Sequence, residues 1–508
     1  MTGQIVIQGF SQQDKVPGFV AETVFGAGPI SASSIPLVLL ICGLKLTGWS
    51  TGLTPDVSIA PIFSAADADA AWGPGSEGAR MAYKALKIQG ITILGCAPTP
   101  GVSAAAATAT ITITGTATGV GTFSYRIAGD PITGGISSGD TPTVIALAIA
   151  NAINAQPTMA VAASPSAGVV TLTWNSAGPR GNDGIIFQQT SFLAAGVSSA
   201  VAGGAALVSS APGESGCRFH SGATAETLTA LLATLTPKRY NRIAAAQYDA
   251  TNLAAWVAQS NAKAGPLVGR TEQYVFGFNG TLSAVNSLAS ATLNDWRSQI
   301  CWLLNSESHP SEIAAAMAAL RVVKEQATPN SGYDGNTLLG IAAQASTADV
   351  AQRSTQQAAL NSGVTPLVTD GQGKVNVVRA ITTHCLNGSN PDFRTLDTAQ
   401  SVVPDFVRDD LNLLWTTGYV VANPYVRDNP SAAEQDPPAG VGTPNGWNAT
   451  VTTELKSLER QLIVTQVALN PPLSLYDNVA GRIESAVPVI PLPLQHQIGV
   501  SVRQLNAA

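Results

Sequence analysis

Charged side chains are scarce in this sequence. Its 26 basic and 32 acidic residues make up 11% of the 508 positions, against about 25% in an ordinary soluble domain. Ala, Gly, Ser and Thr stand in their place, so we expect a surface of short, weakly charged side chains. Such a surface fits two explanations, which are compatible: burial against other copies of the chain, and the alanine and glycine bias of a GC-rich genome.

Basic clusters are absent, and the net charge is −6. A nucleic-acid partner needs a stripe of Lys and Arg that displaces phosphate counterions. We therefore expect no nucleic-acid partner.

Paired cysteines are also absent, because the five cysteines lie far apart and none forms a C-x-x-C motif. Their apolar surroundings predict buried, reduced thiols and a reducing compartment. The five are Cys42, Cys96, Cys217, Cys301 and Cys385.

Targeting and membrane signals are missing. The opening "MTGQIVIQGFSQQDK" has no basic start followed by an apolar run, so we expect no signal peptide. The most apolar stretch, "IPLVLLICGLKL", is broken by Lys45 well short of the ~20 residues of a membrane span. We expect a soluble protein made in a cytoplasm, without stable membrane insertion.

Catalytic motifs are missing too: there is no G-x-S-x-G, Walker loop or H-E-x-x-H. The carboxylate pairs Asp67/Asp69 and Asp409/Asp410 do not face one substrate, because neighbours on a helix diverge. We predict no catalytic, cofactor-binding or metal-binding residues, no cofactor, and no enzyme. The four histidines, none spaced to share a metal, are His220, His309, His384 and His496.

One phosphate-binding spacing does occur, as Gly73, Gly75 and Gly78 form G-x-G-x-x-G. That motif needs a strand directly before it, yet an alanine-rich helical stretch precedes it here. A helix cap at Ser76 with close packing is the favoured interpretation, and an α/β nucleotide-binding enzyme that uses this turn is the alternative.

The order of strand and helix patterns predicts the fold class. Strand and helix patterns alternate before residue 98 and again from 212 to 326, which indicates a largely parallel sheet. Between them lies an Ala-, Gly-, Ser- and Thr-rich stretch, in which 107–129 reads as a β-hairpin. We predict a multidomain α/β and α+β chain: a discontinuous α/β core, an inserted small β-rich module, an α+β C-terminal domain, and extended terminal arms. The expected parts are an N-terminal arm (1–20), an α/β domain (21–98 with 212–345), an inserted module (99–211), a C-terminal domain (366–487), and a linker with arm strand (488–508).

Both chain ends read as short strands. At the C-terminus, branched apolar residues alternate with small or polar ones, after a stiff spacer with three prolines between 488 and 493. Eight spacer residues at about 3.1 Å each reach roughly 25 Å, enough to cross a subunit boundary. The alternative is that the terminal strand folds back onto the sheet of its own chain. The residues expected to form subunit-linking arm strands are Ile5, Val6, Ile7, Ile498, Val500 and Val502.

Three stretches carry a family resemblance, in order and spacing. "AAWGPGSEGARMAYKALK" followed by "ITILGCAP", then "VNVVRAITTHC" with the helix ending "VPDFVRDDLNLLW", and finally "GRIESAVPVIPLPLQHQIGVSVRQL" resemble contractile tail sheath proteins of the Mu-like group. The resemblance covers most of the chain outside the inserted module.

The resemblance implies a non-enzymatic structural subunit of a phage virion. It implies six-membered rings stacked helically around an inner tail tube, with baseplate and terminator partners, assembled in the host cytoplasm. In such a ring the inserted module (99–211) would face outward and the C-terminal domain (366–487) would lie close to the tube. Contraction would drive the tube through a cell envelope during genome ejection, and terminal arms would add strands to a neighbour's sheet. The alternative within this class is the sheath of a bacterial secretion or extracellular injection machine.

The favourable and unfavourable free energies of adding one donated strand nearly cancel. About five ladder hydrogen bonds at ~1 kcal/mol and three buried branched side chains at ~2 kcal/mol give roughly 11 kcal/mol. Ordering nine residues costs about 9–14 kcal/mol. Firm linkage therefore needs several arms acting between neighbours that are already close.

Overall fold

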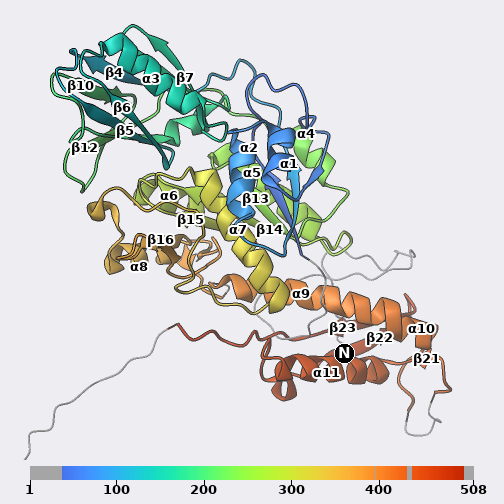
Figure 1. The fold of residues 1–508 in the computed structure, drawn as a ribbon. Coiled ribbons are helices and arrows are strands. Elements are labelled where there is room, and N and C mark those ends of the chain that lie inside the picture. Colours follow the sequence, from blue (N-terminus) through green and yellow to red (C-terminus); the bar gives the residue numbers. More distant parts are fainter. Residues whose placement is uncertain (1–36, 395, 432–436, 497–508) are drawn as a thin grey trace, which may run out of the picture.

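The computed structural model describes residues 37–394, 396–431 and 437–496. Three parts follow one another in space: a β-rich module at one end, an α/β core in the middle, and a smaller helical unit with a β-ribbon at the other end (Figure 1). The predicted fold class, mixed α/β and α+β in several parts, is confirmed.

The core contains an eight-stranded sheet whose inner strands are parallel. Only the outermost strand on each side runs antiparallel to its neighbour. Across the sheet the strands are β17 (Val375–Val377), β16 (Thr365–Thr369), β15 (Ser298–Trp302), β14 (Gln273–Phe278), β13 (Arg242–Ala245), β1 (Val38–Cys42), β3 (Thr92–Cys96) and β2 (Ala60–Ile62).

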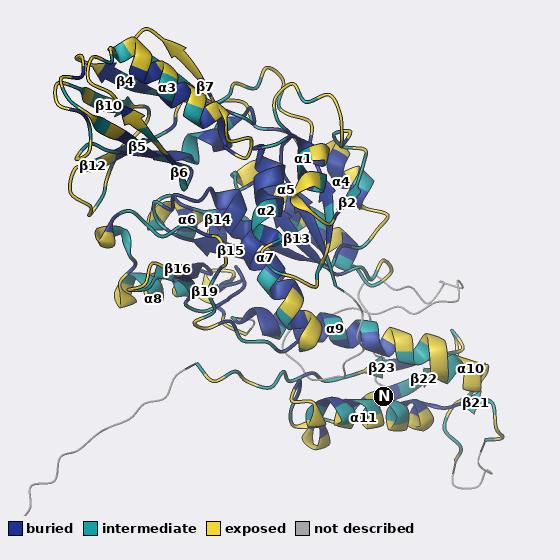
Figure 2. Cartoon of the chain, viewed as in Figure 1, coloured by how far each residue is buried: buried dark blue, intermediate teal, exposed yellow. Residues whose placement is uncertain are grey.

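Helices cover both faces of this sheet because its central strands are apolar on both sides. In β1, Leu39 and Ile41 belong to the apolar cluster on one face, and Leu40 and Cys42 belong to the cluster on the other. The first face carries α1 (Ala65–Trp72), α2 (Glu77–Ala85) and α7 (Pro310–Ala327). The second carries α4 (Thr229–Leu235), α5 (Ala250–Ala264), α6 (Leu282–Ser287) with the π-helix η2 (Leu288–Leu293), and α8 (Arg353–Asn361). Figure 2 shows this core as the most buried part of the chain.

The sheet continues past residue 345, the limit expected for the α/β domain. β16 pairs in parallel with β15, and β17 then returns antiparallel beside β16. The strand pattern expected to open the C-terminal domain therefore completes the core sheet. The connecting short elements are η3 (Thr347–Asp349), β18 (Leu386–Asn387) and β19 (Asn390–Pro391).

The inserted module has its own apolar core between two antiparallel sheets and one helix. Pro142 opens the helix and the Thr141 side chain caps it, as the sequence predicts. The four-stranded sheet is β10 (Ser198–Ala202), β4 (Thr108–Thr114), β8 (Val169–Trp174) and β7 (Val161–Ser166). The five-stranded sheet is β11 (Ala206–Val208), β12 (Glu214–Arg218), β9 (Ile185–Gln189), β5 (Gly121–Ile127) and β6 (Asp130–Ile136), and the helix is α3 (Pro142–Asn154). A 3-10 turn, η1 (Pro179–Asp183), follows β8.

The hairpin predicted over 107–129 is wrong. β4 and β5 lie in different sheets, and β5 forms its hairpin with β6 through Ala128 and Gly129. Both turn residues have positive φ (51° and 83°), which a two-residue hairpin turn requires. The alternation shows that β4 has one apolar face. It does not tell whether β4 and β5 pair in one hairpin or lie in two sheets that pack against each other.

The C-terminal unit is built on two long helices with an apolar seam between them. These are α9 (Thr398–Leu414), which continues through the π-helix η4 (Trp415–Tyr419) into α10 (Val420–Ala422), and α11 (Pro444–Arg460). Its remaining elements are β20 (Tyr425–Val426), β21 (Val441–Gly442), η5 (Val467–Leu469), β22 (Leu473–Asp477) and β23 (Arg482–Ala486).

Candidate functional site

The glycine-rich turn at Gly73–Gly78 is filled by the chain itself. A methyl group on Gly75 would lie 2.0 Å from the Met159 carbonyl oxygen, so the inserted module sits directly on the turn. At the start of α2 the Glu77 amide donates to Ser176 Oγ (3.0 Å) and the Gly78 amide donates to the Leu44 carbonyl (3.0 Å). A phosphate needs those amides free. The structure therefore contradicts the nucleotide-binding alternative at this turn, and Ser76 caps the helix as favoured.

Three of the four histidines make contacts that support the fold. His309 caps α7 and its Nε2 lies 2.9 Å from the Arg180 carbonyl oxygen. His384 stacks on Trp296, with ring centroids 3.5 Å apart. The His220 backbone pairs with Thr108, and its side chain contacts the neighbouring Ser221. Within the described residues no group of His, Cys, Asp and Glu is placed to hold a metal ion, and no helix is long and apolar enough to cross a membrane.

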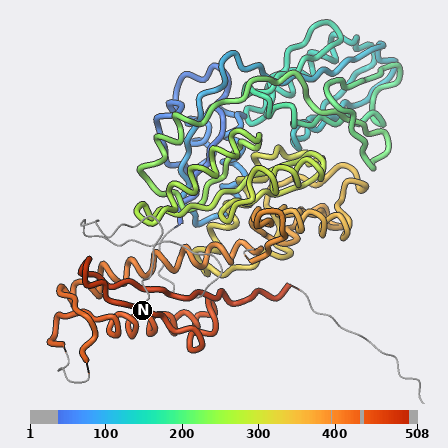
Figure 3. The backbone as a smooth tube through the Cα atoms, turned by 180° about the vertical axis from the view of Figure 1, so that it is seen from behind, coloured from blue at the N-terminus to red at the C-terminus, as the bar shows by residue number. Residues whose placement is uncertain are grey.

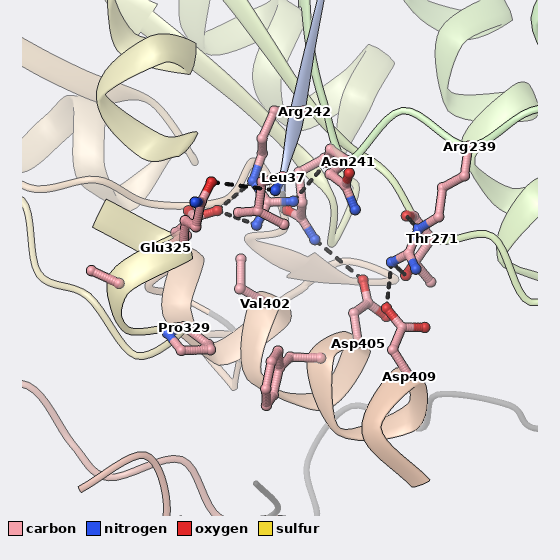
Figure 4. A pocket seen from close by; sticks show the side chains of 14 residues that line it. Leu37, Arg239, Asn241, Arg242, Thr271, Glu325, Pro329, Val402, Asp405 and Asp409 are labelled. Atoms are coloured by element: carbon pink, nitrogen blue, oxygen red, sulfur yellow. Dashed lines mark hydrogen bonds and ion pairs between the residues drawn. The ribbon is translucent and has the colours of Figure 1, made fainter. Parts of the chain in front are cut away.

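A cavity of about 160 Å³ lies where the core meets α9 (Figure 4). Leu37, Arg242 and Gln273 bring to it the amino ends of β1, β13 and β14. Ligands of open α/β sheets bind at the opposite, carboxyl ends of the strands. The position of the cavity therefore indicates a packing gap at the junction between the core and α9, and not a ligand-binding site.

The charges around this cavity are paired with one another. Arg239 Nη2 lies 2.6 Å from Asp409 Oδ2, and Arg242 forms a short ion pair with Glu325. Burial raises the pKa of Glu325, but Arg242 and Arg321 outweigh it and hold that pKa below its usual value. These ion pairs hold α9 and α7 against the sheet, so the charged groups around the cavity have a structural role.

The β-ribbon of the C-terminal unit has two open edges. β22 and β23 pair over five residues, from Leu473↔Ala486 to Asp477↔Arg482. Among the described residues no third strand pairs with either. An isolated two-stranded ribbon is only marginally stable in water, and an unpaired edge is a template for a strand from elsewhere. The ribbon is thus the described element most suited to receive a strand.

Large apolar side chains are exposed around this ribbon. Leu473 on β22 is 56% exposed, Val479 in the hairpin turn 78%, and Leu469 in η5 77%. Such side chains gathered on one part of a surface mark an interaction site. We treat β22, β23 and these three side chains as the candidate assembly surface.

The proline spacer is extended, as predicted, but it lies on its own subunit. Ile490 O accepts from the Thr465 amide (3.1 Å), and the Leu492 amide donates to Ile463 O (3.1 Å). Asn330 Nδ2, next to α7, donates to Leu492 O (2.9 Å). Figure 3 shows this segment, in red, running along the C-terminal unit after β23. The segment expected to act as a free linker therefore contacts the rest of the described chain as far as residue 496.

The arm residues themselves lie outside the described residues. This holds for Ile5, Val6, Ile7, Ile498, Val500 and Val502.

No protein-family model and no curated protein matches this chain. Among solved structures, it is similar to the sheath tail protein of Desulfitobacterium hafniense, with 13% identity over 92% of this chain and 94% of that one and a TM-score of 0.44. It is similar to a chain of the anti-feeding prophage helical sheath in its contracted state, at 10% identity over 97% and 99% of the two chains and a TM-score of 0.46. A chain of the anti-feeding prophage baseplate is similar at 11% identity, with the same coverage and a TM-score of 0.44.

These likenesses concern the overall fold along nearly the whole chain.

The sequence did not reveal one polar contact beside the linker. His496 lies between Asp334 and Asp397, which are 162 and 99 residues away along the chain. The only local signal was a histidine next to a proline-rich segment, which does not name its partners.

Proposed function

We propose that this chain is a structural subunit of a contractile phage tail sheath. The subunits form six-membered rings stacked around an inner tube, and each arm adds a strand to a neighbour's ribbon. The particle also contains baseplate and terminator proteins, and its contraction drives the tube through a cell envelope. The observation that carries the proposal is the two-edged ribbon β22–β23 beside exposed apolar side chains.

The architecture supports this function in two further ways. Terminal segments of 36 and 12 residues flank the described residues, and both contain a strand pattern that could fill a ribbon edge. The inserted module is attached at the end of the core opposite the C-terminal unit (Figure 1), so it can face outward while the C-terminal unit faces the tube.

The decisive experiment is negative-stain microscopy of the full chain and of a chain lacking 497–508. The full chain should form tubes or stacked rings, and the truncated chain should remain a folded monomer. A circular-dichroism melt confirms that the truncated protein is folded. Tubes of normal order from the truncated chain would refute strand donation by this arm.

A thermal-shift measurement tests the enzyme alternative. Because the turn at Gly73–Gly78 is occupied, millimolar ATP or NAD should leave the melting temperature unchanged. A ligand that binds the folded state at 100 times its Kd would add about 2.7 kcal/mol of stability, so a clear rise in melting temperature would restore that alternative. Genes for a tube and baseplate beside a capsid gene would separate a phage from an injection machine.

A further inference from the structure

The linker ends in a histidine held between two carboxylates. His496 Nδ1 lies 2.6 Å from Asp334 Oδ2, and its Nε2 lies 3.3 Å from Asp397 Oδ2. The histidine side chain is 14% exposed. Asp334 follows α7 and Asp397 precedes α9, so the ring joins the end of the linker to both the core and the C-terminal unit.

One of the two carboxylates is itself fixed. Arg379 donates to Asp397 through Nε (2.7 Å) and Nη2 (2.9 Å). This bidentate geometry holds the Asp397 carboxylate in one orientation. Asp334 is 37% exposed and has no second cationic partner among the described ion pairs.

The protonation state of the ring decides whether both contacts are hydrogen bonds. A neutral imidazole has one N–H, so one ring nitrogen would present a lone pair to a carboxylate. An imidazolium donates from both nitrogens. The two carboxylates of Asp334 and Asp397 therefore face the two ring nitrogens, and Arg379 is the cation that holds Asp397 in place.

We propose that His496 is a positioning residue that fixes, through its contacts with Asp334 and Asp397, the point at which the C-terminal arm leaves its parent subunit. This inference rests on the proposed strand donation. Twelve residues, 497–508, remain beyond the anchor, and at about 3.3 Å each they reach roughly 40 Å. An anchored arm therefore finds only an adjacent subunit, and its strand meets the acceptor ribbon in one register.

Loss of the contacts between His496 and the two carboxylates should release the end of the linker. A released linker makes the free arm longer, and the effective concentration of its strand at the acceptor falls.

The test compares His496→Ala with His220→Ala, which replaces an exposed histidine of the inserted module and serves as the matched control. The critical concentration for tube formation is measured by sedimentation. His496→Ala should raise it roughly tenfold, since both contacts with the carboxylates are lost and the effective concentration of the strand falls. Asp334→Asn should give a smaller rise, because the contact with Asp397 remains, and His220→Ala should match the wild type.

A second readout does not depend on assembly. In the folded monomer, nitrogen NMR of labelled histidine should show His496 ring resonances that move when Asp334→Asn is introduced. Ring resonances that this variant leaves unchanged would overturn the contact with Asp334. Equal critical concentrations for His496→Ala and His220→Ala would overturn the anchor itself.

The chain lacking 497–508 separates this inference from the proposed function. If it forms normal tubes, strand donation fails whatever His496 does. If it forms none while His496→Ala assembles like the wild type, donation stands and the anchor fails.

Discussion

Arg80 Nη1 lies 2.5 Å from Asp130 Oδ2, which joins the core helix α2 to the first residue of β6 in the inserted module. The same guanidinium donates through Nε to Glu312 of α7 (2.6 Å), whose side chain is fully buried. One arginine therefore ties three elements together. The inserted module is fastened to the core by a buried charge network, so we expect the two to move as one body.

Replacing Arg80 with Met should destabilise the chain by about 3–5 kcal/mol, because it leaves the buried Glu312 carboxylate without its main partner. Chemical denaturation gives the change in the free energy of unfolding. Arg353→Met, at an exposed position on α8, is the matched control and should change it by less than about 0.5 kcal/mol. A similar effect of both variants would show that the network contributes nothing specific.

Asp410 on α9 should make stability depend on pH. Burial, and then the nearby Glu454 and Asp409 carboxylates, raise the pKa of Asp410 to about 7, against about 3.9 in an unfolded chain. Between these values the folded state holds a proton that the unfolded state has lost. Stability should therefore fall as pH rises from about 4 to about 7 and then level off.

Asp410→Asn removes this titration. It should stabilise the protein by roughly 2 kcal/mol at pH 8 and have little effect near pH 4, as followed by thermal melts across the pH range. Asp428→Asn, at an exposed carboxylate, should show no such pH-dependent difference. Destabilisation by Asp410→Asn at pH 8 would mean that the carboxylate has a stabilising partner there.

Gly78 is predicted to reject any side chain. A methyl group at this position would lie 2.4 Å from the Trp72 ring. Both residues are buried, and Trp72 belongs to the apolar cluster on the first face of the sheet. Gly78→Ala should cost about 1–3 kcal/mol through overpacking. Gly371→Ala, where a methyl group meets nothing within 4 Å, should be nearly neutral. Denaturation midpoints of the two variants make the comparison, and a neutral Gly78→Ala would contradict the close packing.

Leu473 should matter for assembly and not for folding. Its side chain is 56% exposed on β22, so Leu473→Asp should change the stability of the monomer by less than about 0.5 kcal/mol. The charge would be buried when a strand or a neighbour covers the ribbon, and tube formation should be lost. Val102→Asp, at an 89% exposed site outside the candidate assembly surface, is the control. Microscopy of both variants decides, and intact tubes from Leu473→Asp would remove Leu473 from the interface.

The sequence by itself determined the elements and their faces. The continuous apolar run in 38–42 marks a strand that is apolar on both sides, and Ser76, Thr141 and Pro142 mark helix starts, because these signals come from residues a few positions apart. Regular alternation of such elements was enough to predict a parallel sheet, helices on both faces and an inserted β-rich module.

Only the tertiary structure decided which faces meet. β4 and β5 carry the pattern of a hairpin yet lie in two sheets, and the proline spacer looks free yet binds residues near 330 and 463–465. His496 acquires its meaning from Asp334 and Asp397, which are distant in sequence. The physical reason is that an apolar stripe or a polar side chain specifies that a partner is needed, while the partner's identity depends on how the whole chain packs.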